Sequence, residues 1–200
     1  MLALIMAGGA GTRLNLGEKP LVQICGQPMI EYIIHAFERA DSEVIVIVSP
    51  GTPYTANWCR AHRISLITAD GIGYIPDLIQ AVEETGERNP LFTSVSDLPC
   101  LTPGTVAQIR RAYEHSGKDA CSTWVPKRLC DQSGCRTTCV EEIEGEPASP
   151  AGINILRGNR IHDEQDELKL LMHQKELIFN INTREELMHA EQFLRNQSRR

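Results

Sequence analysis

Three glycines within four residues follow an apolar segment at the start of the chain. The segment Leu2–Met6 reads LALIM, which predicts a buried strand. Because glycine lacks a Cβ, the turn after it can direct successive backbone N–H groups at one point and bind an anion. Arg13 offers phosphate oxygens a planar fork, and Lys19 adds a point charge. The pattern predicts a phosphate-binding loop made of Ala7, Gly8, Gly9, Ala10, Gly11, Thr12, Arg13 and Lys19.

Two common phosphate-binding motifs do not fit this loop. A P-loop needs GxxxxGK followed by Ser or Thr, whereas Lys19 is followed by Pro20. A dinucleotide fingerprint needs GxGxxG, but the third glycine position after Gly9 and Gly11 holds Leu14. A purely structural glycine turn is the remaining alternative, and the neighbouring Thr12, Arg13 and Lys19 argue against it.

A carboxylate and two pairs of neutral groups follow later apolar segments. Asp97 comes directly after Leu91–Val95, and doubly wound sheets bind ligands at the carboxyl ends of such strands. Mg²⁺ prefers one or two carboxylates together with substrate phosphates, so Asp97 is the candidate metal ligand; a turn-capping Asp is the alternative. Asparagine side chains can donate to phosphate or hold a metal-bound water. The candidate acceptor or phosphate residues are Gly152, Asn154, Asn180 and Asn182.

The segment Asp70-Gly71-Ile72-Gly73-Tyr74 contains two further glycines, Gly71 and Gly73. Its glycines give the flexibility expected of a loop that lines a base or a ribose. We therefore assign Asp70, Gly71 and Gly73 to nucleotide binding, with a plain glycine turn as the alternative.

Several of these motifs resemble a known family. AGGAGTRL, EKPL and GQPMIEY are similar to the AGGxGTR…KP signature of sugar-phosphate and cofactor nucleotidyltransferases. The resemblance implies that the loop binds a nucleoside triphosphate. It further implies that Arg13 and Lys19 stabilise charge on the α-phosphate and on the leaving pyrophosphate. Asp97, in the sequence SDLP, matches the family's metal site with a single Asp and is therefore expected to be catalytic.

Further motifs narrow the resemblance. PAGIN and ELIFNINT, together with the short chain and the GxGY loop, resemble the archaeal adenosylcobinamide-phosphate guanylyltransferase family. This implies GTP and a corrinoid phosphate as substrates, Mg²⁺ as cofactor, and adenosylcobinamide-GDP and pyrophosphate as products. The NINT motif also fits guanylyl transfer to the molybdenum cofactor, and other bases or sugar-phosphate acceptors stay open. A catalytically inactive nucleotide-binding regulatory module is the alternative of another class.

The elements that must position these residues alternate along the chain. Alternating strands and helices imply an α/β fold: a single-domain, Rossmann-like, doubly wound sheet, mostly parallel, with helices on both faces. The expected strands are Leu2–Met6, Glu43–Val48, Ile64–Thr68, Leu91–Val95, Ala120–Val125, Gly152–Leu156 and Leu177–Ile181. The expected helices are Met29–Ala40, Pro76–Thr85, one from Pro103 with Thr102 as N-cap, Asp166–Gln174, and Thr183–Arg195 with a Thr183/Glu186 capping box.

One polar segment interrupts this alternation. Residues 126–150 carry an acidic run and three cysteines, and we expect an irregular excursion over the mouth of the site, with a hairpin as one form. The domain is expected to span residues 1–196, with a frayed tail at 197–200. The seven cysteines are expected to be reduced thiols; the cluster Cys130, Cys135 and Cys139 lacks an evident fourth ligand for zinc or iron–sulfur.

Charge and hydropathy limit the classes of partner. The 200 residues carry a formal net charge of −6, so nucleic acid is an unexpected partner. No apolar stretch reaches the roughly 18 to 20 residues that span a bilayer, and the start lacks a basic leader, so we expect a cytoplasmic protein without membrane insertion. A homodimer is compatible with the sequence.

Overall fold

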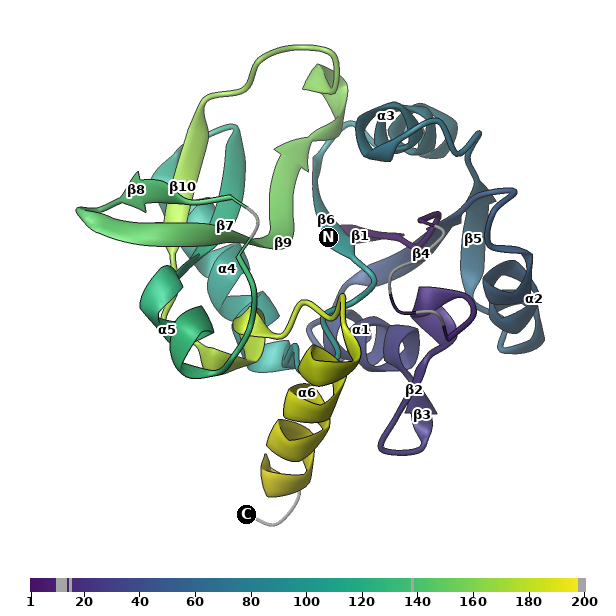
Figure 1. Cartoon of the computed structure of the whole chain (residues 1–200). Coiled ribbons are helices and arrows are strands. Elements are labelled where there is room, and N and C mark those ends of the chain that lie inside the picture. The colour runs from purple at the N-terminus through teal and green to yellow at the C-terminus, as the bar shows by residue number, and fades with distance from the viewer. Residues whose placement is uncertain (10–13, 15, 138, 198–200) are drawn as a thin grey trace.

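A computed structural model describes residues 1–9, 14, 16–137 and 139–197 (Figure 1). Its centre is an eight-stranded sheet of order β10-β7-β9-β6-β1-β4-β5, with β8 paired to β9. The strands are β1 (Leu2–Met6), β4 (Glu43–Val48), β5 (Ser65–Thr68), β6 (Pro90–Val95), β7 (Ala120–Pro126), β8 (Glu141–Ile143), β9 (Glu146–Arg157) and β10 (Glu167–Leu171). A separate small hairpin pairs β2 (Gln23–Ile24) with β3 (Gln27–Pro28).

Helices cover both faces of the sheet, and one face carries more of them than the other. The helices are α1 (Met29–Glu38), α2 (Pro53–Ala61), α3 (Tyr74–Thr85), α4 (Pro103–Ser116), α5 (Lys127–Gln132) and α6 (Arg184–Gln197). Three short 3₁₀ turns are η1 (Lys19–Leu21), η2 (Gly158–Arg160) and η3 (Lys175–Ile178). Helix α3 packs its Leu78, Ala81 and Val82 on one face, and Figure 1 shows it opposite α1, α4, α5 and α6. The expected doubly wound α/β fold is confirmed.

The strands around β1 are parallel and mostly buried. Strand β1 pairs with β4 on one side and with β6 on the other, both in parallel. The run EVIVIV of β4 is β-branched at nearly every position, which suits a strand covered on both faces. Because the chain moves from β1 to opposite sides of the sheet, a crevice opens at the carboxyl ends of these strands.

Strand β9 departs from the expected parallel pattern. It runs antiparallel to β6, β7 and β8, and it is longer than the expected Gly152–Leu156. Its register against β7 shifts between Ser122 and Trp124, where Gly152 adopts φ +81°. The region 126–150 contains the expected hairpin, formed by β8 and β9, and also the helix α5.

Two sequence expectations near the C-terminus are wrong. Residues Asp166–Gln174 do not form a helix, because Glu167–Leu171 is strand β10, parallel to β7. The alternation of exposed Glu167 and Lys169 with half-buried leucines is a strand pattern that outweighs the helical preference of Glu, Leu and Lys. Residues Leu177–Ile181 do not form a strand; the turn η3 leads into an irregular segment whose apolar side chains are buried.

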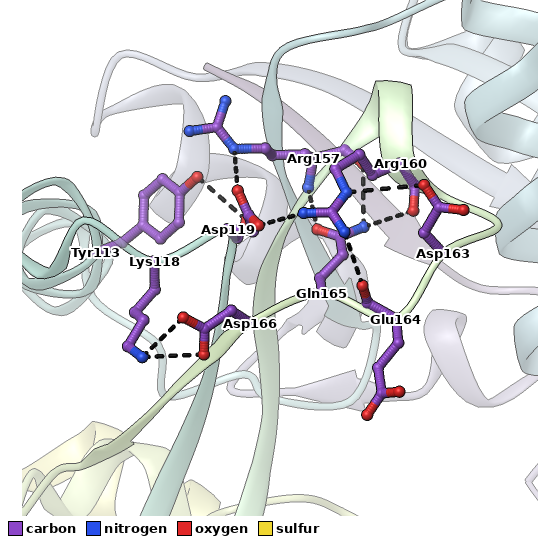
Figure 2. Close-up of polar contacts among 9 residues, drawn as sticks. All are labelled: Tyr113, Lys118, Asp119, Arg157, Arg160, Asp163, Glu164, Gln165 and Asp166. Atoms are coloured by element: carbon purple, nitrogen blue, oxygen red, sulfur yellow. Dashed lines mark hydrogen bonds and ion pairs between the residues drawn. The ribbon is translucent and has the colours of Figure 1, made fainter.

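A polar network closes the end of the sheet remote from the carboxyl ends of β1 and β6 (Figure 2). Asp119, just before β7, forms ion pairs with Arg157 at the end of β9 and with Arg160 in η2. The Arg157 Nε–Asp119 Oδ1 distance is 3.0 Å. The Gln165 amide nitrogen donates to the carbonyl oxygens of Arg157 and Arg160, at 3.2 and 2.9 Å. This network fastens the 158–166 connection before β10 begins.

The expected N-cap of α4 and the capping box of α6 are both present. Thr102 Oγ1 accepts from the backbone N–H of Thr105. Thr183 Oγ1 accepts from the N–H of Glu186, and the Glu186 carboxylate accepts from the N–H of Thr183. Of the expected tail, Gln197 belongs to α6, and residues 198–200 lie outside the described part of the chain. Within the described ranges, no helix has both the length and the apolar character needed to cross a membrane.

Candidate functional site

A cavity of about 650 Å³ lies at the carboxyl ends of β1, β4, β5 and β6. This is the size range of small-molecule sites. Its lining includes the predicted residues Gly8, Gly9, Lys19, Asp70, Gly71, Gly73, Asp97 and Asn182. Segments far apart in the sequence therefore meet here. None of the described residues of 126–150 is among the lining residues, so the excursion does not cover the cavity as expected.

Lys19 occupies the centre of the polar contacts. Its Nζ donates to Asp97 Oδ2 in an ion pair and to Asn182 Oδ1 at 2.8 Å. The side chains of Lys19 and Asp97 are each 13% exposed, so the pair is shielded from bulk water yet open to the cavity. The Lys19 ammonium thus connects the loop after β1, the end of β6 and residues 180–183, which are called the NINT segment below.

Glu18 fixes the position of the loop that carries Lys19. Its carboxylate accepts from the backbone N–H groups of Tyr54 and Thr55, at 2.8 and 2.6 Å, and from Thr55 Oγ1 at 2.6 Å. These N–H groups belong to the first turn of α2, which lacks a side-chain cap from its own N-cap residue Thr52. An acidic side chain at a helix N-terminus is favourable because it accepts from N–H groups that have no partner within the helix. It also interacts favourably with the positive end of the helix dipole. Glu18 therefore anchors Lys19 to the body of the fold.

The NINT segment is held by a buried carboxylate. Glu186 is 2% exposed and accepts from the N–H groups of Asn182, Thr183 and Arg136, at 2.7, 3.0 and 3.2 Å. The Ile181 N–H donates to the Asp97 carbonyl oxygen at 3.0 Å. These contacts place Asn180 and Asn182 beside Asp97 although no strand carries them.

Asn180 completes the contacts of the Asp97 carboxylate. With its amide nitrogen facing Asp97, the orientation that the neighbouring acceptors favour, it lies 3.2 Å from both carboxylate oxygens. Burial raises the pKa of the Asp97 carboxyl above its ordinary value, and the Lys19 ammonium opposes that shift. The cluster is therefore a polar, partly dehydrated group set at the end of a central strand.

On the opposite wall of the cavity, the backbones of Gly8 and Gly71 pass close to Ser49. A Cβ on Gly8 would lie 3.1 Å from Ser49 Cβ, and Ser49 Oγ donates to the Gly8 carbonyl oxygen at 2.7 Å. Gly71 has φ +77° and would also bring a Cβ to 3.1 Å from Ser49 Cβ. A side chain at either position would crowd Ser49, and the positive φ of Gly71 is a second reason for glycine there.

Side chains of the helix that follows it fix the backbone of the loop from Asp70 to Tyr74. Asp77 is 7% exposed and accepts from the N–H groups of Gly71 and Ile72, at 3.0 and 3.2 Å. The Asp70 N–H donates to Gln80 at 2.9 Å, and the side chain of Asp70 stays exposed. The structure thus brings Asp70, Gly71 and Gly73 to the cavity as expected.

Several predicted residues do not meet at the cavity. Asn154 lies in the middle of β9, opposite Thr93 on β6. Gly152 lies at the β9 bulge, where a Cβ would lie 2.7 Å from Val95 Cγ2. Ala10, Gly11, Thr12 and Arg13 lie outside the described residues. Ala7 is buried and donates from its N–H to the Ile47 carbonyl oxygen at 2.7 Å.

Ser49, Pro50 and Gly51 line the cavity although no motif predicted them, and the sequence does contain a signal for them. The turn Ser49-Pro50-Gly51 directly follows the apolar strand β4, and all three residues line the cavity. Turn residues after a strand parallel to β1 must lie at the same sheet edge as the glycine loop. The sequence gives a weaker signal for Asp77, because an Asp in the first turn of a helix is common and does not by itself indicate a binding site.

The oxygen donors beside Asp97 suit a divalent cation. Carboxylate and amide oxygens are the hard ligands that Mg²⁺ prefers, with phosphates and waters in the remaining positions. The described residues contain no group of three or more His, Cys, Asp and Glu side chains arranged to hold a metal by themselves. The Asp97 carboxylate and the Asn182 amide oxygen fit a metal that binds together with a phosphate-bearing substrate.

Comparisons with known proteins agree with this geometry. Residues 3–178 match the family model described as a MobA-like NTP transferase domain. The chain is 30% identical over 206 aligned positions to the adenosylcobinamide-phosphate guanylyltransferase of Methanocaldococcus jannaschii, covering 98% of each chain.

Solved structures show the same fold. Molybdopterin-guanine dinucleotide biosynthesis protein A from Archaeoglobus fulgidus superposes with a TM-score of 0.69 at 17% identity, covering 98% of this chain and 100% of that one. A CMP:2-keto-3-deoxy-manno-octonic acid synthetase complexed with CTP gives a TM-score of 0.72 at 13% identity, covering 98% of each.

Proposed function

The chain belongs to the MobA-like NTP transferase family, and we propose that it transfers GMP from GTP to adenosylcobinamide phosphate. The products are adenosylcobinamide-GDP and pyrophosphate. The observation that carries the proposal is the contact of Lys19 with both Asp97 and Asn182 in the cavity after β1 and β6. The similarity to the M. jannaschii guanylyltransferase over nearly the whole chain supports the choice of base and acceptor.

The reaction is an in-line substitution at phosphorus. An oxygen of the acceptor phosphate attacks the α-phosphorus of GTP, a new P–O bond forms, and the bond to the β-phosphate bridging oxygen breaks. The acceptor phosphate is anionic at neutral pH, so the step needs no strong general base. This agrees with a described cavity lining that contains no histidine. Catalysis then consists of positioning and charge stabilisation.

Each side of the cavity has a role in this scheme. The glycine loop and Lys19 hold the triphosphate, and Lys19 offsets charge on the α-phosphate and the leaving pyrophosphate. Arg13 is assigned the same role from the sequence. The wall of Ser49, Asp70, Gly71 and Gly73 lines the nucleoside side. Asn182, which lines the cavity and accepts from Lys19, and Asn180, which lies beside Asp97, are assigned to the acceptor phosphate.

Asp97 is the proposed ligand of Mg²⁺. Its carboxylate would hold the ion together with substrate phosphates, and the amide oxygen of Asn182, which accepts from Lys19 beside Asp97, is a further donor. Mg²⁺ would supply charge neutralisation at the phosphates.

Molybdopterin is the rival acceptor, because the Archaeoglobus protein of similar fold is named for molybdopterin-guanine dinucleotide biosynthesis. The deciding experiment is pyrophosphate release from GTP with adenosylcobinamide phosphate and molybdopterin offered separately. We expect release with the corrinoid alone. Release only with molybdopterin, or equal release with CTP, UTP or ATP in place of GTP, would overturn the proposal.

A further inference from the structure

The hairpin between β2 and β3 has a cysteine where its turn favours another residue. Cys25 and Gly26 are the two central residues of this turn, with φ values of +49° and +87°. Positive φ at both positions is typical of a type I′ turn, which favours Asn, Asp or Gly at the first of them. A larger side chain there crowds the following carbonyl oxygen. Turn formation therefore does not explain why this position holds a cysteine.

The contact of the Cys25 thiol lies outside the hairpin, on helix α6. Cys25 Sγ is 3.8 Å from the carbonyl oxygen of Glu191, and Figure 1 shows the hairpin beside this helix. A second thiol lies against the preceding residue of the same helix, because Cys100 Sγ is 3.8 Å from the carbonyl oxygen of Ala190. Successive residues of an α-helix are offset by only about 1.5 Å along its axis. The two sulfur atoms therefore meet the same part of α6.

Tyr32 gives independent support for the proximity of the two thiols. Its hydroxyl donates to the carbonyl oxygen of Ile24, the residue before Cys25, at 3.0 Å. Burial raises the pKa of Tyr32, and the charges of Cys25 and Cys100 both add to that shift. One side chain is thus close to both sulfur atoms, although they belong to segments far apart in the sequence.

The two thiols differ in their surroundings. Cys25 is exposed, whereas Cys100 is only 2% exposed and burial raises the pKa of its thiol. Arg195 lies near Cys25, since its guanidinium pairs with the Glu191 carboxylate at 2.8 Å, and the charges of Glu191 and then of Cys25 raise the pKa of Arg195. Exposure and a nearby cation are typical of reactive cysteines, and burial is typical of inert ones. An oxidant is therefore expected to react with Cys25 first.

Each thiol follows one partner of the ion pair in the cavity. Cys25 lies in the hairpin that begins directly after the turn η1, which contains Lys19. Cys100 lies in the turn that follows Asp97 at the end of β6. A bond between the two sulfur atoms would therefore connect the same two segments that the Lys19–Asp97 ion pair connects.

We propose that Cys25 and Cys100 form a redox-sensitive pair, which a peroxide converts into a disulfide. The Cys25 sulfur attacks one oxygen of hydrogen peroxide, so that an S–O bond forms and the O–O bond breaks. The other oxygen leaves as water with the Cys25 thiol proton, and Cys25 becomes a sulfenic acid. The Cys100 sulfur then attacks the Cys25 sulfur: the S–S bond forms, the S–O bond breaks, and a second water carries away the Cys100 proton. Two thiols are oxidised and one peroxide is reduced.

The disulfide is independent of the proposed function, whereas its effect on activity rests on that function. Both sulfur atoms leave their carbonyl contacts on α6 when they join, so the segments that carry Lys19 and Asp97 shift relative to each other. A displacement of about 1 Å can cost about 10² in rate. We therefore expect the oxidised protein to transfer GMP about tenfold more slowly or worse, and a dithiol reductant to restore the rate.

The test is peptide mapping of the whole chain by mass spectrometry, without reductant, after treatment with hydrogen peroxide. We expect a peptide pair joined through Cys25 and Cys100 that dithiothreitol separates. Cys25→Ser is expected to abolish this pair, and Cys139→Ser, which changes another exposed thiol, is the matched control that keeps it. Cys100→Ala is expected to stop the reaction at the Cys25 sulfenic acid, which dimedone traps. Thermal melting of each reduced variant verifies folding.

The stability of a second Cys25 variant tests the argument from the turn. Cys25→Asn supplies a residue that type I′ turns favour, and we expect it to raise the melting temperature by about 2 to 4 °C. A lower melting temperature would mean that the thiol supports the fold, and it would remove that argument for a redox role.

The possible outcomes separate the two proposals. A wild-type Cys25 that peroxide leaves unmodified, that stops at the sulfenic acid, or that pairs with a thiol other than Cys100 overturns the redox pair. A Cys25–Cys100 disulfide with an unchanged rate of GMP transfer overturns the effect on activity and supports the pair. Absence of GMP transfer by the reduced wild type overturns the proposed function, and the peptide map still decides the disulfide.

Discussion

The Lys19 ammonium donates to the Asp97 carboxylate although 78 residues separate them in the chain. Lys19 follows the glycine loop and Asp97 follows β6, so the contact joins the two sides of the crevice beside β1. A charge pair that is only 13% exposed on each side chain costs free energy to dehydrate. In the proposed function, substrate phosphates take over the contacts of Lys19, which would account for a dehydrated charge pair at a strand end.

Lys19→Ala is expected to lower kcat/KM for GTP by about 10² to 10³, the cost of removing one group that stabilises developing charge. Circular dichroism and thermal melting separate this loss from unfolding, because the variant also leaves Asp97 without its counter-ion. Lys118→Ala is the matched control, since that ammonium pairs with exposed Asp166 at the remote end of the sheet. Turnover by Lys19→Ala within threefold of the wild type would refute the role of Lys19.

The sequence predicted the half of the site that lies on regular strands. Gly8, Gly9 and Asp97 directly follow buried apolar strands, so their meeting follows from the parallel topology alone. Asn180 and Asn182 were predicted as site residues for a wrong structural reason, because the segment before them is a 3₁₀ turn and not a strand. A short buried apolar run has the same composition in either form, and its partner, Glu186, is set by tertiary contacts.

Strand β10 shows a second limit of local patterns. DELKLL contains good helix formers and also alternates exposed with half-buried positions, and only pairing with β7 selects the strand. The structural consequence is that β9, β7 and β10 extend the sheet past β6.

Glu18→Gln is expected to cost about 1 to 2 kcal/mol of unfolding free energy, because it replaces an anion at the N-terminus of α2 by a neutral amide with one acceptor oxygen. We expect KM for GTP to rise as well, since Glu18 fixes the loop that presents Lys19. Urea unfolding and steady-state kinetics measure the two effects. Glu84→Gln, an exposed site on α3, is the control. An unchanged unfolding midpoint for Glu18→Gln would contradict the anchoring role.

Glu186→Gln is expected to destabilise the fold by about 2 to 3 kcal/mol, because hydrogen bonds to a charged group are lost and a buried amide N–H₂ then faces backbone donors. Three N–H groups depend on this carboxylate, including that of Asn182. KM for the acceptor should therefore rise more than KM for GTP. The neighbouring Glu185→Gln is exposed and serves as control. Equal changes in both KM values would argue for a purely structural role.

Asp119→Ala is expected to lower stability by about 1 to 2 kcal/mol, since both Arg157 and Arg160 lose their shared carboxylate (Figure 2). Asp166→Ala removes an exposed pair with Lys118 and should cost less than about 1 kcal/mol. Because this network lies at the end of the sheet remote from the cavity, kcat is expected to stay unchanged. Chemical denaturation measures the free energy of unfolding of both variants. Equal losses would contradict the expectation that Asp119→Ala costs more than Asp166→Ala.

Thiol accessibility should divide the seven cysteines into two groups. Burial raises the pKa of Cys59 to about 11 and that of Cys121 and Cys135 to about 12, and it also raises the pKa values of Cys100 and Cys130. Cys25 and Cys139 are exposed. The thiolate is the reactive form, and a thiol with a pKa of 11 is ionised to only about one part in a thousand at pH 8.

Iodoacetamide at pH 8 is therefore expected to add two adducts to the folded protein, at Cys25 and Cys139, and seven after unfolding. Peptide mapping by mass spectrometry identifies the sites. The same experiment tests the cysteine cluster, because a metal held by Cys130, Cys135 and Cys139 would protect Cys139 until a chelator is added. Labelling of Cys139 at full rate without a chelator means that the cluster consists of ordinary thiols: Cys130 buried in α5, Cys135 buried just after it, and Cys139 exposed.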